Sequence, residues 1–264
     1  MSSASKTATK QEINDAFSEL EAGLTCAQSV YTNLIRVVDA LADNPQAQCA
    51  VDSTLATQTR VRLLSELVRM HLREEEIQWT LGRVISLACH ASRRFQCQAG
   101  QCEMWHELLA MRSAHPLSIR VQESSLRASE ALLQCNEVNI TKLCPQQYLD
   151  DLTSIMGRFL HIETPRRRAH SLVVLALRVL VAMYSSPRQA RSILFNDEKS
   201  IQGDKWTLII SRCMLDSFSI FNRQQNSVRV WLQMVLLLLR QTPAKVVEMM
   251  FSRSIWWFVA VLEK

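Results

Sequence analysis

The sequence predicts an all-α fold, and three observations lead to this prediction. The chain of 264 residues contains only 5 glycines and 6 prolines, too few for the turns of a β-sandwich or a doubly wound sheet. The prolines stand where helices are expected to begin. Between them, apolar residues such as Val61, Leu64 and Val68 recur at steps of three and four, which is the spacing of one helix face.

The prolines mark the boundaries between the predicted helices. They stand in the pairs Asn44-Pro45, His115-Pro116, Cys144-Pro145, Thr164-Pro165, Ser186-Pro187 and Thr242-Pro243. In four of these pairs the preceding side chain carries an oxygen that can cap a helix, and proline is favoured at the first helical position because no N–H is needed there. We therefore expect each pair to end one helix and start the next.

The predicted helices, in chain order, are 10–43, 57–73, 75–94, 103–113, 117–135, 146–162, 165–184, 187–195, 205–221, 226–241 and 243–262, and the first is expected to break near Gly23. Several of them start about 20 residues apart, so that a pair of helices recurs about every 40 residues, the period of HEAT and armadillo repeats. No strict sequence repeat is visible. The prediction is therefore an irregular α-solenoid of HEAT/armadillo-like helical pairs with about 10–11 helices, and a compact helical bundle is the alternative.

Domain organisation follows from the same pattern. Residues 1–9 carry no apolar stripe and are expected to form a flexible N-terminal segment. Residues 10–264 are expected to form a single helical-repeat domain, with a sub-boundary near 95–103.

Cysteine usage points to a reducing compartment. The chain has 8 cysteines, and most lie within or beside apolar helical patterns, where a free thiol behaves as a small hydrophobe. The N-terminal residues lack the apolar core of a secretion signal. We therefore expect a nuclear or cytoplasmic protein, in which the sequon at Asn139 carries no glycan.

Three segments, 171–184, 228–239 and 255–262, are apolar on nearly all sides. Each is too short or too interrupted to span a bilayer, so we expect no membrane contact and a buried position for each. The sequence leaves two roles open for the large side chains of the last helices. They form core, or they are an apolar surface for a partner or a second copy of the chain: Trp231, Trp256, Trp257 and Phe258.

Motifs of catalysis are missing from the sequence. It has no nucleophile elbow, metalloprotease helix or phosphate-binding loop, so no catalytic residue and no cofactor are predicted. The best metal candidates are Cys89, His90, Cys97, Cys102 and His106. Their spacing lacks a CxxC knuckle, and we expect a loop around Gly100 with incidental thiols instead of a zinc site.

Positive charge is concentrated in the second part of the chain. Residues 1–110 hold 10 Lys and Arg against 13 Asp and Glu, whereas residues 111–264 hold 20 against 12. A candidate site for an anionic partner stands where two predicted helices begin: Arg166, Arg167, Arg168, His170, Arg188 and Arg191. Helix N–H groups and guanidiniums together bind phosphate or acidic peptide, and a solvated run of charge is the other interpretation. Aromatic residues for base stacking are not interleaved with it.

From residue 171 onward the sequence resembles the C-terminal helical-repeat region of the ATR-interacting protein family. The residues that carry the resemblance are VLVAMYSSPRQA (179–190), CMLDSFSIFNRQ (213–224) and SVRVWLQMVLLLLRQTPAKVVEMM (227–250). The resemblance covers about a third of the chain. The acidic N-terminal segment and the dimerising coiled coil of that family have no counterpart in this sequence. The resemblance implies a nuclear, non-enzymatic subunit that docks on the helical repeats of a checkpoint kinase, with 205–262 as the contact region.

The expected function is therefore that of a non-catalytic helical-repeat adaptor that binds protein partners, with a regulatory subunit of a DNA-damage checkpoint kinase as its most specific form. In this view nucleic acid is contacted only indirectly. The alternative is a nucleic-acid-binding repeat protein that uses the arginine patch, and its affinity would fall steeply with salt.

Overall fold

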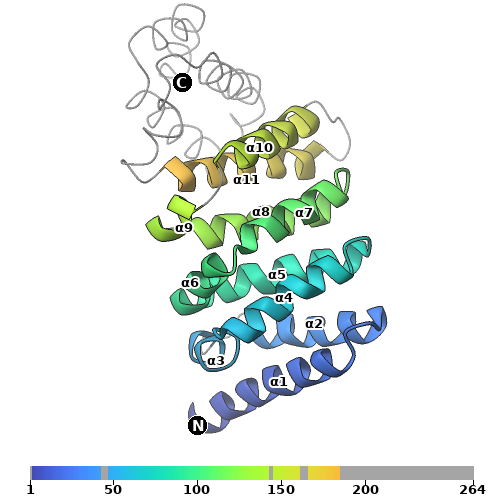
Figure 1. Ribbon diagram of the computed structural model, residues 1–264, viewed down its shortest axis with the longest axis vertical. Coiled ribbons are helices and arrows are strands. Elements are labelled where there is room, and N and C mark those ends of the chain that lie inside the picture. The colour runs from blue at the N-terminus through green and yellow to red at the C-terminus, as the bar shows by residue number, and fades with distance from the viewer. Residues whose placement is uncertain (1, 43–46, 143–144, 161–165, 185–264) are drawn as a thin grey trace, which may run out of the picture. The chain divides into compact units, whose positions relative to one another are not determined.

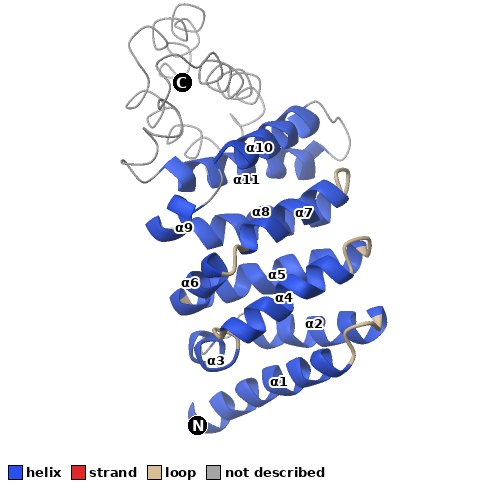
Figure 2. Ribbon diagram, viewed as in Figure 1, coloured by secondary structure: helices blue, strands red, loops and turns tan. Residues whose placement is uncertain are grey.

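Every regular element that the structure describes is an α-helix (Figures 1 and 2). The computed structural model describes residues 2–42, 47–142, 145–160 and 166–184. The all-α prediction is therefore confirmed for this part of the chain. The chain divides into two compact units, 1–144 and 145–264, and the division lies beyond the segment 95–103, which belongs to the first unit.

The first unit contains nine of the described helices. They form three successive sets, and in each set two longer helices are followed by a shorter one. They are α1 (Ser2–Ala22), α2 (Ala27–Leu41), α3 (Ala47–Thr54), α4 (Gln58–Met70), α5 (Glu75–Ala91), α6 (Arg93–Gln101), α7 (Met104–Ala114), α8 (Ile119–Leu133) and α9 (Glu137–Lys142). In the second unit α10 (Pro145–Leu160) packs against α11 (Arg166–Tyr184).

Two rows of helices form the first unit. In one row, α5 packs between α2 and α8. In the other row, α4 packs against α7, and both lie in front of α5 and α8 in Figure 1. The core between the rows is apolar, with Leu64 of α4, Leu81 and Val84 of α5, and Leu108 of α7 all fully buried. Each such side chain contributes about 1.5–3 kcal/mol by leaving water.

Short polar side chains cap several of these helices. Ser92 accepts a hydrogen bond from the backbone N–H of Phe95 at 3.0 Å and starts α6, and Ser118 accepts one from Val121 at 3.3 Å and starts α8. Pro116 therefore lies in the turn before the cap, so its predicted place at the first helical position is wrong. Pro145 does begin α10, whereas the other four prolines lie outside the described residues.

The helix predictions differ from the structure mainly in the short elements. The break near Gly23 is confirmed, because α1 ends at Ala22 and α2 begins at Ala27. The helix that starts at Ser2 includes residues 2–9, for which no helix was expected. The expected loop around Gly100 is wrong, because Arg93–Gln101 forms α6, with Phe95 and Ala99 buried. The predicted helices 187–195, 205–221, 226–241 and 243–262 lie outside the described residues.

Candidate functional site

Two buried glutamines hold the ends of the front helices against the rear row. The Nε2 of Gln78 on α5 donates hydrogen bonds to the carbonyl oxygens of Val68 at 3.0 Å and His71 at 2.8 Å, at the end of α4. Gln122 on α8 does the same at the end of α7, with the carbonyl oxygens of Arg112 and His115 at 2.8 and 2.9 Å. Both side chains are fully buried. The same arrangement thus recurs in two successive sets of helices.

Two histidines join successive sets of helices by the same kind of contact. His71 follows α4, and its Nε2 atom lies 2.7 Å from the carbonyl oxygen of Leu24 in the turn before α2. His115, which follows α7, lies 2.8 Å from the carbonyl oxygen of Leu72 in the turn before α5. A carbonyl oxygen only accepts, so Nε2 carries the proton in both histidines. Each contact thus joins the end of one helix to the turn of the preceding set.

The exposed side of α5 and α8, which we call the rear face, carries a cluster of one aromatic ring, two guanidiniums and one carboxylate. We call it the Trp79 cluster (Trp79, Arg83, Arg120 and Glu76). Trp79 is half-buried on α5. The Cζ atom of Arg83 lies 5.1 Å from the ring centroid of Trp79, and that of Arg120 on α8 lies 5.4 Å from it. Cations at this distance are attracted to the face of an indole. The ring is thus held in a fixed position at the surface.

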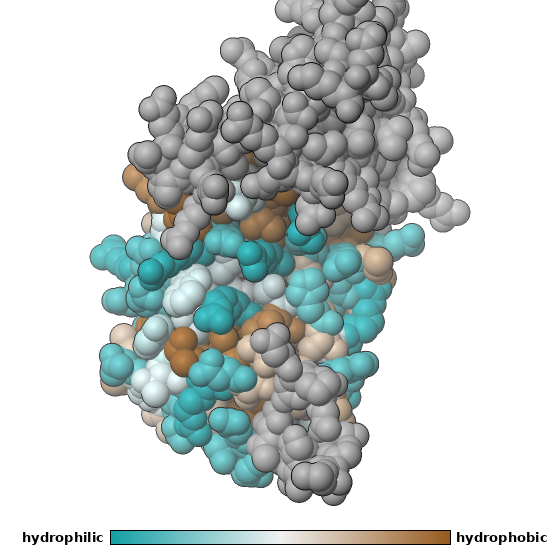
Figure 3. Space-filling view, turned by 180° about the vertical axis from the view of Figure 1, so that it is seen from behind, coloured by the Kyte–Doolittle hydropathy of each residue, from teal (hydrophilic) through white to brown (hydrophobic). Residues whose placement is uncertain are grey.

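Charged side chains around the Trp79 cluster link α5 to α8. Glu76 accepts a hydrogen bond from Arg120 at 3.0 Å, and Glu75 accepts one from the Ser118 hydroxyl at 2.6 Å. Further along α8, Arg127 donates to Glu123 at 2.6 Å. Figure 3, which views the molecule from behind Figure 1, shows that this side is largely hydrophilic, with residues of intermediate and apolar character between the polar ones.

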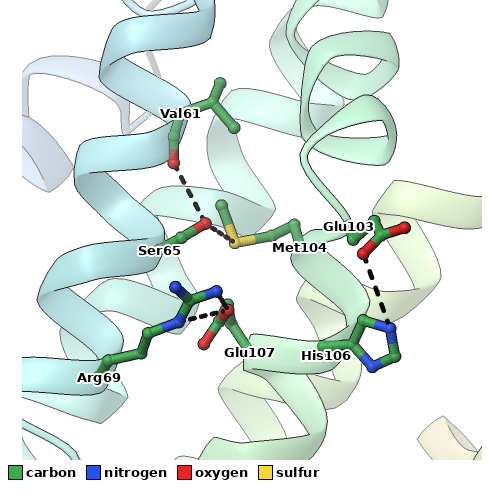
Figure 4. Close-up of polar contacts among 7 residues, drawn as sticks. All are labelled: Val61, Ser65, Arg69, Glu103, Met104, His106 and Glu107. Atoms are coloured by element: carbon green, nitrogen blue, oxygen red, sulfur yellow. Dashed lines mark hydrogen bonds and ion pairs between the residues drawn. The ribbon is translucent and has the colours of Figure 1, made fainter.

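The front row is joined by polar contacts of a different kind (Figure 4). Glu107 on α7 is buried, and its Oε1 accepts hydrogen bonds from Nε and Nη2 of Arg69 on α4, the former at 2.9 Å. These hydrogen bonds raise the pKa of the Arg69 guanidinium. Beside them the hydroxyl of Ser65 donates to the carbonyl oxygen of Val61 at 3.3 Å and lies 3.7 Å from the sulfur of Met104. These contacts satisfy buried groups between α4 and α7, so they serve packing.

An arginine contact joins the first set of helices to the second, between α1 and α4. The Cζ atom of Arg60 lies 4.9 Å from the ring centroid of Phe17. Its Nη1 donates a hydrogen bond to Oδ1 of Asn14 at 3.1 Å. Burial lowers the pKa of the Arg60 guanidinium, which Glu21 partly offsets. The contact ties α4 to the helix below it.

Among the residues that the structure describes, no group of three or more His, Cys, Asp or Glu side chains is arranged to hold a metal. The best metal candidates of the sequence are spread over different environments: Cys89 is buried in α5, His90 is exposed, and Cys97 is half-buried in α6. Asn139 of the sequon is also buried, and its Nδ2 donates to the carbonyl oxygens of Gln96 and Leu132 at 3.0 and 2.9 Å. A glycan would replace one of the two hydrogens on this nitrogen and so require the loss of at least one of these hydrogen bonds.

Burial raises the pKa of the Cys89 thiol, so little thiolate forms in the folded protein. Alkylation by iodoacetamide at about pH 8 is expected to modify the exposed Cys26, Cys49 and Cys135 at least about tenfold faster than Cys89, since the thiolate is the nucleophile. Mass spectrometry of peptides after short labelling measures the ratio. Labelling in denaturant serves as the control and should make the rates similar, whereas rapid native labelling of Cys89 would contradict its burial.

The residues predicted for an anionic partner are described only in part. Arg166, Arg167, Arg168 and His170 belong to the first two turns of α11, so the helix does begin at the arginine run as expected, but their side chains lie outside the described part. The same is true of the whole of Arg188 and Arg191, and of Trp231, Trp256, Trp257 and Phe258.

None of the helices within the described ranges has the length and apolar character that crossing a membrane requires.

Comparison with known proteins gives no relative. No family model matches the chain, and neither the curated proteins nor the solved structures yield a match.

The Trp79 cluster was not predicted from the sequence, although a signal was present. His71 and Gln78 are matched by His115 and Gln122 at a spacing of 44 residues (71 to 115 and 78 to 122). At the same spacing Arg83 corresponds to Arg127. Aligning the chain with itself on these pairs would have identified α5 and α8 as equivalent helices and placed Trp79 on their shared outer face.

Proposed function

We propose that the chain is a non-catalytic scaffold that binds a protein partner through the rear face of α2, α5 and α8. The observation that carries this proposal is the Trp79 cluster, in which an indole and two guanidiniums from two helices are fixed at the surface. Tryptophan and arginine contribute most often to binding energy at protein interfaces, with tyrosine next to them. Helix α2 packs against α5 and carries two half-buried apolar or aromatic side chains, Tyr31 and Ile35.

The architecture that we propose is an irregular α-solenoid of HEAT/armadillo-like repeats. Its support is the recurrence of the buried glutamine and of the histidine contact in successive sets of helices. Such arrays present extended surfaces to their partners.

The most specific form of the proposal is a nuclear regulatory subunit of a DNA-damage checkpoint kinase, bound to the helical repeats of that kinase. It rests on the resemblance of residues 171–264 alone. The argument from the Trp79 cluster does not depend on this resemblance, because residues 171–264 belong to the second unit and the cluster belongs to the first.

Affinity purification of the full chain from cells that express it tests the proposal. Trp79→Ala is expected to reduce the recovered partner by about tenfold or more, because it removes the central ring of the surface. Met70→Ala is the matched control, since Met70 is a large side chain that is 44% exposed at the end of α4. If Trp79→Ala, folded by circular dichroism, retained every partner of the wild type, the rear face would not be the binding surface.

A further inference from the structure

The two arginines of the Trp79 cluster differ in their charge balance. Arg120 is paired with Glu76 at 3.0 Å. Arg83 lies over the same ring but has no carboxylate partner among the residues that the structure describes. Two guanidiniums therefore share one carboxylate, and the cluster carries an excess positive charge that is centred on Arg83.

Arg83 has N–H groups for a further contact. Its Cζ atom lies 5.1 Å from the ring centroid of Trp79, and an aromatic face attracts a cation without accepting its N–H groups one by one as an oxygen does. The edge of a guanidinium matches the two oxygens of a carboxylate, and its attachment to a fixed ring reduces the side-chain entropy that is lost on binding.

We propose that the Trp79 cluster binds one aspartate or glutamate side chain, with an apolar residue beside it, in a segment of a partner protein. The proposal rests on the proposed function and names the chemistry of its partner. The carboxylate pairs with Arg83, and an apolar residue beside it packs on the exposed part of Trp79. An unpaired guanidinium beside a half-buried aromatic ring selects a ligand that carries a carboxylate next to an apolar side chain.

Carboxylates on the same face favour a protein segment over a nucleic acid. Glu76 lies in the Trp79 cluster, and Glu123 on α8 already pairs with Arg127. A nucleic acid gains affinity from many phosphates, each neutralised by a cation. Arg120 and Arg127 are already paired with Glu76 and Glu123, so Arg83 is the cation of these three that remains for an anion. A single carboxylate needs only this one guanidinium.

Selection of displayed random peptides on the immobilised full chain provides the probe. Enriched peptides are expected to share an aspartate or glutamate next to an aromatic or aliphatic residue. A synthetic peptide of the most enriched sequence should bind Arg83→Gln at least about tenfold more weakly than the wild type. Arg62→Gln is the control, because Arg62 is exposed on α4 in the other row, and it should leave the affinity unchanged.

Replacing the acidic residue of the peptide by its amide closes a double-mutant cycle. This replacement should weaken binding to the wild type by the same factor as Arg83→Gln does. It should not weaken binding to the Arg83→Gln variant any further. Enriched peptides without a shared acid, or full affinity in Arg83→Gln, would overturn the inference. If Trp79→Ala still abolished binding in that case, the scaffold function would stand.

Two further outcomes count against the proposal. Binding of an oligothymidylate that is lost in Arg83→Gln would assign the cluster to phosphate instead of a protein carboxylate. Failure to enrich any peptide would contradict both the inference and the peptide-binding form of the scaffold.

Discussion

Gln78→Glu is expected to destabilise the protein by about 3–5 kcal/mol at pH 8, the cost of a buried charge without a partner. The wild-type Nε2 donates to two carbonyl oxygens, those of Val68 and His71. A carboxylate at this position would place negative charge against both oxygens in a site that is fully buried. Urea denaturation followed by circular dichroism measures the loss, and Gln122→Glu should behave alike because its contacts are the same.

The destabilisation by Gln78→Glu should depend on pH. Burial and the facing carbonyl oxygens raise the pKa of the introduced carboxyl above its value in the unfolded chain. Protonation then favours the folded state, so the loss relative to the wild type is smallest at acidic pH and grows as the pH rises. Gln58→Glu is the control at an exposed site in the first turn of α4, where the change should stay within about 0.5 kcal/mol. A Gln78→Glu protein as stable as the wild type at pH 8 would show that Gln78 does not make these bonds.

Long helices such as α4 and α5 could be predicted from the sequence because they carry a continuous apolar stripe. In α4 this stripe is Val61, Leu64 and Val68, all fully buried, and no other element has to be known to recognise it. The short helices lack this signal. In α9, only Asn139 and Ile140 are buried, so the helix depends on contacts with α6 and α8 that are distant in sequence.

The roles of Gln78 and Trp79 could not be predicted, because they depend on how helices pack. The two residues are adjacent in α5, yet Gln78 is fully buried and Trp79 is half-buried. By polarity alone their positions would be exchanged. Gln78 is buried because the end of α4 offers two carbonyl oxygens, and Trp79 is at the surface because Arg120 of α8 reaches its ring. Both partners come from other helices.

Gly100→Ala is expected to destabilise the protein by about 1–3 kcal/mol, although alanine favours a helix over glycine by about 1 kcal/mol. A Cβ atom on Gly100 would lie 1.8 Å from Oδ1 and 2.4 Å from Cγ of Asn139. Asn139 is buried and holds the carbonyl oxygens of Gln96 and Leu132 through Nδ2. It therefore has to give up hydrogen bonds, or α9 has to move away from α6, to make room for the methyl group.

Gly157→Ala separates this crowding from the intrinsic preference for a helix. Gly157 is exposed within α10, and nothing lies within 4 Å of a Cβ atom built there. This substitution should raise the stability of the chain by up to about 1 kcal/mol, since only the helix preference changes. Urea denaturation of both variants thus yields shifts of opposite sign if α6 and α9 approach as closely as the structure indicates. Equal upward shifts would mean that Gly100 has open space, and that the close approach of the two short helices does not exist.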